Sequence, residues 1–195
     1  MSTYAARNRL VGEKYSIDII GLYVGAIRER FDNPAEGFPW RWTSDANKSR
    51  IVIEAGSVDT HDQTDARPSI YVDRSGMVFS QVVLGNMADF DMQTAETKQY
   101  CMANSQISVD CISSNRGESS NLADITAHHL LMSEDVFRSA LGFRDMSPIT
   151  MGNTQPWEKD DRVFVTRVTS EFSYELSWSN KPISDRLERM FLYLQ

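Results

Sequence analysis

The feature that most constrains the fold is RVFVTRVTSEFSYELSWS, residues 162–179, in which large apolar and polar side chains alternate. Alternation with a period of two is typical of a β-strand with one covered face and one solvated face. One parity contains Phe164, Val168, Phe172, Tyr174, Leu176 and Trp178, and the other contains mainly polar residues. A single strand of this length would span about 55 Å, against a usual ~17–20 Å. The segment therefore either contains a bulge or projects beyond its own domain, and its apolar face belongs to the core or to a subunit interface.

Four further segments are predicted strands that join residues 162–178 in one sheet: 51–55, 69–73, 77–84 and 98–113. The dipeptide Ser75-Gly76 predicts a hairpin turn between the second and third of them. Residues 85–97 are acidic and are interpreted as a loop. In the segment 98–113, Ile107, Val109 and Cys111 occupy one parity, which indicates one covered face.

Two helices are predicted to pack against this sheet. Residues 16–31 carry apolar side chains at spacings of three and four: Ile17, Ile20, Val24, Ile27 and Phe31. The second helix, residues 116–132, follows Asn115, which has capping-box spacing to Glu118. Ser133 is expected to cap a short third helix that ends before Gly142. This order of elements predicts an α/β (α+β) domain.

The predicted domain covers residues 1–181 and includes a long loop at 32–50. Residues 182–195 are expected to form a separate C-terminal docking helix. Its apolar stripe consists of Leu187, Met190, Phe191 and Leu194. Helices shorter than about 12–15 residues are marginal in water, so this stripe must find a partner surface. For a chain end in an oligomer, a neighbouring subunit is the expected partner.

Composition excludes some classes of protein. The chain has 195 residues and a formal net charge of −7, which argues against a sequence-independent nucleic-acid binder, because such proteins need a basic face. No apolar run approaches the ~20 residues that cross a bilayer, so no membrane association is expected. Cys101 and Cys111 would lie ~33 Å apart on one strand, too far for a disulfide, and are expected to be reduced.

Signals for catalysis are weak. The sequence contains no G-x-S-x-G, P-loop, G-x-G-x-x-G or H-E-x-x-H motif. The adjacent His128 and His129 fail the spacing of a helical zinc site, so His128 is interpreted as a surface residue and His129 as a hydrogen-bonded core residue. Mixed carboxylate and imidazole groups that could bind a divalent metal occur together only at Asp59, His61, Asp62 and Asp65. Their spacing matches no known metal motif, so no metal or other cofactor is expected.

Aromatic side chains mark possible contact surfaces. Trp40 and Trp42 flank an arginine in a Pro-containing loop, and either pack onto the domain or form an aromatic contact surface. Trp157 lies in the long loop 143–161, and loops of this length commonly bind a neighbour. The predicted interface residues are Trp40, Trp42, Trp157, Phe172, Tyr174, Trp178, Leu187, Met190, Phe191 and Leu194.

The order of elements over residues 67–178 resembles the tail terminator and neck proteins of tailed bacteriophages. In that family an extended strand runs into a helix that opens with arginine and acidic residues, followed by Leu-Ala-Asp. The corresponding residues here are Arg116, Glu118, Leu122, Ala123 and Asp124. The loop at 34–66 and the C-terminal helix have no counterpart in the resemblance.

The resemblance implies a tail-terminator-like fold, with a mixed, mainly antiparallel sheet and helices on one side. It also implies a non-enzymatic virion protein, assembled in the host cytoplasm into a homo-oligomeric ring, typically a hexamer. Such a ring lies at the head-proximal end of the tail and joins the tail tube protein to the head-tail connector, with DNA only passing through its lumen. Two alternatives are a metal-dependent hydrolase that uses Asp59, His61 and Asp62, and a monomeric protein-binding module that uses the two tryptophans of the 32–50 loop.

Overall fold

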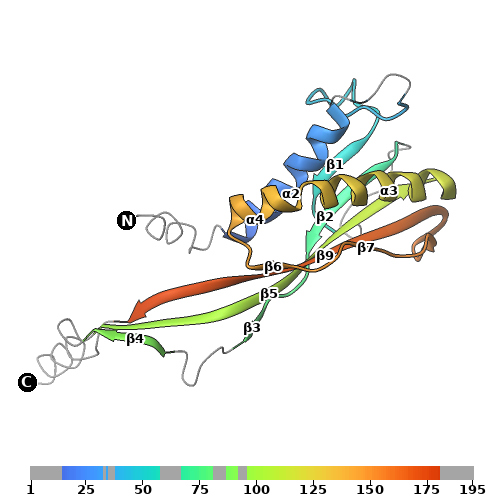
Figure 1. The fold of residues 1–195 in the computed structure, drawn as a ribbon. Coiled ribbons are helices and arrows are strands. Elements are labelled where there is room, and N and C mark those ends of the chain that lie inside the picture. Colours follow the sequence, from blue (N-terminus) through green and yellow to red (C-terminus); the bar gives the residue numbers. More distant parts are fainter. Residues whose placement is uncertain are drawn as a thin grey trace, which may run out of the picture.

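The computed structural model describes residues 15–32, 34, 38–57, 67–80, 87–91 and 96–180 (Figure 1). The helices in this part of the chain are α2 (Tyr15–Asp32), α3 (Arg116–Met132) and α4 (Glu134–Leu141). The strands are β1 (Val52–Ala55), β2 (Ser69–Arg74), β3 (Val78–Ser80), β4 (Met87–Asp91), β5 (Glu96–Ser113), β6 (Asp145–Met146), β7 (Thr150–Met151), β8 (Gln155–Trp157) and β9 (Asp160–Asn180). The predicted fold class, a mixed α/β protein with a mainly antiparallel sheet, is confirmed.

All the described strands belong to one sheet, whose central order is β1-β2-β5-β9-β6. Strand β1 pairs with β2 in parallel, and the other pairings are antiparallel. The strands β2, β3 and β4 follow one another along the same edge of β5. The short strands β6, β7 and β8 follow one another along the opposite edge of β9. The sheet is therefore built around the β5–β9 pair.

The predicted hairpin across Ser75-Gly76 is wrong. Strand β2 ends with Arg74 opposite Ile107, and β3 begins with Val78 opposite Asn104, so both strands run in the same direction along β5. The residues between them do not reverse the chain, and among the described glycines only Gly56 and Gly142 have a positive φ. A two-residue hairpin turn needs positive φ, so the backbone at Ser75-Gly76 is not that of a hairpin turn.

Strand β9 forms an uninterrupted antiparallel ladder with β5, from Thr97 opposite Asn180 to Ser113 opposite Phe164. At ~3.3 Å per residue, the 21 residues of β9 span about 70 Å. Figure 1 shows this strand pair continuing well past the three helices. The sequence left two alternatives open, a bulge or a projecting strand. The structure shows the projecting strand.

The helices cover one face of the sheet and form the main core with it. The buried side chains of α2 are Ile19, Tyr23, Val24, Ile27 and Phe31. Those of α3 include Leu122, Ala123 and Leu130. They pack against odd-numbered residues of β5, such as Ile107 and Val109, which confirms the predicted covered face of that strand.

A smaller apolar cluster lies on the other face of the sheet. Tyr71 of β2 and Ile112 of β5 are buried there, against the partly buried Trp157, Val163 and Val165. The face away from the helices is therefore solvated over most of its length but covered at the end where β8 folds back. No helix in the described ranges is long and apolar enough to cross a membrane. The predicted C-terminal helix, 182–195, lies outside the described residues.

Candidate functional site

The junction of β5 and α3 is held together by hydrogen bonds of the polar side chains at the start of the helix. Asn115 Oδ1 accepts hydrogen bonds from the backbone N–H groups of Gly117, at 2.9 Å, and Glu118, at 3.4 Å. Ser113 Oγ accepts the Asn115 backbone N–H at 3.0 Å and donates its own proton to Glu118 Oε2. The predicted side-chain cap at Asn115 is therefore confirmed, but the reciprocal bond of a capping box is not formed, because the Asn115 N–H binds Ser113 and not Glu118.

The same glutamate anchors the loop that follows α2. Trp40 Nε1 donates to Glu118 Oε1 at 2.7 Å, and the Trp40 side chain is buried. Trp42 is half-buried, and its ring lies 4.9 Å from the guanidinium carbon of Arg28. Arg28 also donates two hydrogen bonds to the carbonyl of Ile53, at 2.7 and 3.1 Å. Both tryptophans thus make contacts within the subunit, Trp40 with Glu118 and Trp42 with Arg28, and we do not place them in an intermolecular interface.

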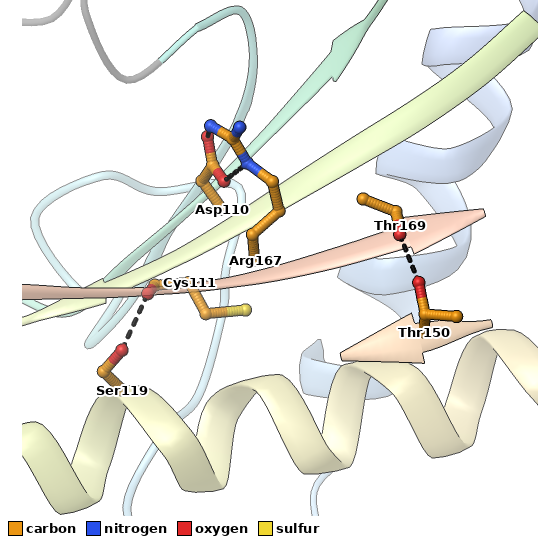
Figure 2. Close-up of polar contacts among 6 residues, drawn as sticks. All are labelled: Asp110, Cys111, Ser119, Thr150, Arg167 and Thr169. Atoms are coloured by element: carbon orange, nitrogen blue, oxygen red, sulfur yellow. Dashed lines mark hydrogen bonds and ion pairs between the residues drawn. The ribbon is translucent and has the colours of Figure 1, made fainter. Parts of the chain in front are cut away.

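Short polar side chains join α3 to the centre of the sheet (Figure 2). Ser119 Oγ donates to the backbone carbonyl of Cys111 at 2.9 Å and shares a 2.8 Å hydrogen bond with Thr166. Because Cys111 is fully buried, the pKa of its thiol is raised to about 12. A thiol in this setting is protonated at neutral pH and is a poor nucleophile.

On the opposite face of the sheet, Arg167 of β9 forms a two-point ion pair with Asp110 of β5 (Figure 2). Its Nε lies 2.7 Å from Oδ1 and its Nη2 lies 3.0 Å from Oδ2. The Asp110 side chain is only 5% exposed, whereas that of Arg167 is 58% exposed. Nearby, Thr150 and Thr169 share a hydrogen bond between β7 and β9. These contacts hold β5, β9 and β7 in register.

The two adjacent histidines lie as the helix geometry predicted. His129 Nε2 lies 3.0 Å from the carbonyl oxygen of Ala26 in α2, whereas His128 is exposed. Burial is the main reason why the pKa of His129 is lowered, and nearby Arg30 lowers it further against the opposing hydrogen bond to Ala26. His129 therefore connects two helices.

An open depression of about 330 Å³ crosses the sheet on the face away from the helices. Its floor includes Asn104 and Gln106 of β5 and Glu171 and Ser173 of β9. It contains one carboxylate from β9 and one, Asp145, from β6. No group of three or more metal-ligating side chains occurs in the part of the chain that the structure describes.

Beyond this depression the sheet continues as a narrow projection, which we call the arm. It consists of residues 96–104 of β5, residues 173–180 of β9, and strands β3 and β4 (Figure 1). At its base, Phe143 stacks on Phe172, with ring centroids 4.3 Å apart, and lies 6.3 Å from the ring of Tyr174. Tyr174 also donates its hydroxyl proton to Met77 Sδ at 3.1 Å.

The predicted interface residues lie in different parts of the structure. Phe172 and Tyr174 lie in the subunit's own core, at 3% and 4% exposure, and Trp157 lies in the smaller cluster behind the sheet. The backbone of Trp178 lies in the arm. The apolar residues of the C-terminal segment and the metal-binding candidates lie outside the described residues and stay predictions: Leu187, Met190, Phe191 and Leu194; Asp59, His61, Asp62 and Asp65.

One property of the arm is not indicated by any pattern in the sequence. Val78 and Phe79 of β3 are 64% and 60% exposed, although both side chains are large and apolar. Their strand is described over Val78–Ser80, within the predicted strand 77–84, and the residues after Ser80 lie outside the described part of the chain. A scan of the sequence against protein-family models and a search of curated proteins both find no match.

Proposed function

We propose that this protein is a non-enzymatic structural subunit of a phage virion. It forms a ring at the head-proximal end of the tail, as a tail terminator or neck protein, and joins the tail tube to the head-side connector. The observation that carries the proposal is the arm, because it extends an ordered sheet far beyond the helices that cover the rest of that sheet.

An arm of this kind is expected to have low stability in an isolated subunit. Isolated two-stranded β-ribbons are marginally stable in water, and a third strand helps mainly when one face of the ribbon is also covered; no helix of the described chain covers the arm (Figure 1). Here β3 also exposes two large apolar side chains along the arm's edge. Assembly with neighbouring subunits would cover such surface, and repeated side-by-side contacts of one type close into a ring when the rotation allows.

The electrostatics fit a channel for DNA. The chain carries a formal net charge of −7. A lumen through which DNA must slide benefits from weak contact with phosphates, since basic groups would bind them and release counterions. The similarity in the order of elements to tail terminator and neck proteins supports this particular place in the virion.

Two groups of types that occur in catalytic sites, the His129 imidazole and the Cys111 thiol, have structural roles. His129 joins two helices, and the Cys111 thiol is buried under α3. These contacts give a positive reason to assign both groups to the fold.

The proposal is tested by the mass and shape of the purified protein. Sedimentation should give a mass that is a fixed multiple of 22.2 kDa, and electron microscopy should show rings with a central opening. In the phage that encodes the chain, deletion of its gene should leave filled heads and tails that do not join. A mass of one chain at all concentrations, or joined particles without the protein, would contradict the proposal.

A further inference from the structure

The outer edge of β9, which faces away from β5, is paired with short strands up to the base of the arm. Short strands pair with this edge at three places: β8 near Val165, β7 at Val168 and Thr169, and β6 at Phe172 and Ser173. Beyond Ser173, no strand of the described chain pairs with it. Strand β9 nevertheless continues to Asn180.

The hydrogen bonds already present determine which backbone groups face this edge. The carbonyl of Arg167 accepts from Gly152 N, that of Glu171 from Ser147 N, and that of Ser173 from Arg144 N, at 2.8 to 2.9 Å. In a strand, every second residue directs its N–H and C=O to the same edge. Residues 175, 177 and 179 therefore direct theirs outward, and residues 174, 176, 178 and 180 direct theirs to β5.

Three residues with outward N–H and C=O groups form a ladder ready for another strand. Proteins usually protect such an edge with lysine, proline, a bulge or a covering segment, because an open edge templates pairing with another chain. The sequence of this edge, YELSWSN for residues 174–180, contains no proline and no basic residue. Pairing with β5 is also unbroken here, so no bulge disturbs the edge.

The opposite side of the arm offers a second, different edge. Gln106 O accepts the backbone N–H of Ser75 at 2.9 Å, so even-numbered residues of β5 bond toward β2, β3 and β4. Phe79 lies opposite Ala103 and Phe90 lies opposite Thr97, both odd-numbered residues of β5. The backbone groups of Phe79 and Phe90 therefore face away from β5, on either side of a register shift between Met87 and Asp89 of β4.

We propose that the outer edge of β9, at residues 175–179, pairs with the β3–β4 edge of a second copy of this chain. The occupant is a second copy because one arm carries both complementary edges, on opposite sides, and because exposed Val78 and Phe79 mark the receiving edge. An interface between two different surfaces of identical subunits is head-to-tail, which is the geometry that builds rings. Main-chain hydrogen bonds across the junction continue the sheet from subunit to subunit.

This inference rests on the proposed assembly, and it makes a sharper statement about how assembly occurs. Ser177→Pro removes one outward N–H, which makes no hydrogen bond within the described chain, so the variant should fold, since proline is tolerated on edge strands. It should sediment as one chain at concentrations where the wild type is oligomeric. Ser177→Thr, which keeps the N–H, is the matched control and should assemble normally.

A second variant blocks the other edge. Phe79→Pro combined with Phe90→Pro should also be monomeric, whereas Phe79→Ala combined with Phe90→Ala keeps both N–H groups and should retain assembly to a greater degree. Each blocked variant keeps one intact edge of opposite type. An equal mixture of the two should therefore form a species of two chains and nothing larger.

The outcomes separate the two proposals. A wild type that is monomeric at all concentrations overturns the proposed assembly and this interface with it. An oligomeric wild type whose Ser177→Pro variant assembles equally well overturns the interface alone. Self-pairing of the β9 edge would let the Phe79/Phe90 proline variant dimerise without its partner, and this result would also overturn the head-to-tail pairing.

Hydrogen exchange tests the same interface without substitutions. The amides of residues 175, 177 and 179 should be protected in the assembled wild type and should exchange rapidly after dilution to monomer. The amides of residues 176 and 178, which face β5, should stay protected in both states. Protection of residues 175, 177 and 179 in the monomer would show that the chain covers its own edge, and would overturn the proposal.

Discussion

Glu118 makes a testable contribution to the stability of the whole subunit. Its carboxylate accepts the Trp40 indole N–H at 2.7 Å and the Ser113 hydroxyl, and so ties the loop after α2 and the end of β5 to the start of α3. Both donors belong to buried side chains, at 8% and 3% exposure. Glu118→Ala would leave each of them without this acceptor.

The expected loss follows from these contacts. Hydrogen bonds to charged groups contribute about 1.5–3 kcal/mol each, and a carboxylate in the first helical turn adds about 0.3–1 kcal/mol through the helix dipole. Glu118 is half-buried, so water can replace part of what is lost. We therefore expect Glu118→Ala to lower the free energy of unfolding by about 3 kcal/mol, just below the summed range of about 3.3–7 kcal/mol. Glu118→Gln keeps two hydrogen-bonding atoms and should lose about 1–2 kcal/mol.

Urea unfolding followed by tryptophan fluorescence measures this difference. All variants are compared at one protein concentration, because assembly would otherwise shift the apparent stability. The slope of free energy against urea should not change, since the fold is retained. Asp124→Ala is the matched control, an exposed carboxylate on the same helix, and should stay within about 0.5 kcal/mol of the wild type. If Glu118→Ala also stays within that margin, the joint is not a source of stability and the reasoning is refuted.

Three further predictions follow from other contacts. Arg167→Ala leaves the buried carboxylate of Asp110 without its two-point partner and should cost about 1–3 kcal/mol in urea unfolding, less than for a fully buried pair because Arg167 is half-exposed. Since the pKa of His129 is lowered in the fold, the unfolded chain binds more protons, so stability should fall as pH drops below about 6.5 toward the folded-state pKa. His129→Asn should weaken this dependence relative to a His128→Asn control, as measured by unfolding at several pH values. Cys111 should resist thiol reagents at pH 8 in the native protein and react fully in urea.

The long strands and helix α3 could be predicted because the residues that their local patterns mark as apolar or as caps are buried or form caps in the fold. In β9 the even-numbered residues 168, 172 and 174 are buried, as the alternation indicated. Helix α3 has the predicted bounds, because Asn115 caps its first turn with its own side chain. The buried stripe of α2 differs from the prediction. It includes Ile19 and Tyr23, whereas the predicted Ile20 is only partly buried; the side chain of Ile17 lies outside the described part of the structure.

Other elements depend on contacts that a local pattern does not encode. Residues 85–97 were interpreted as an acidic loop, but part of that segment, β4, pairs with β5. The strands β6, β7 and β8 are two or three residues long, and they are strands only because the edge of β9 lies beside them. Ser133 was expected to cap α4 with its side chain. Instead its hydroxyl donates to His129 O at 2.8 Å and ends α3, because one residue separates the two helices.

The side chains of β9 on the helix-facing side change in size along the strand, and this change explains where the subunit stops covering itself. Under the helices the strand places small polar residues, Thr166 and Ser170, which let α3 and α2 approach and hydrogen-bond through Ser119 and Tyr23. At the base of the arm the same parity changes to large aromatic residues, and Phe143 stacks on the first of them. Large side chains fill space that no helix occupies. The sequence of β9 therefore matches a strand whose first part lies under the helices and whose last part lies beside other strands. Within the described chain those other strands lie on the β5 side alone, and the side that remains is the edge at which a second subunit is expected to add.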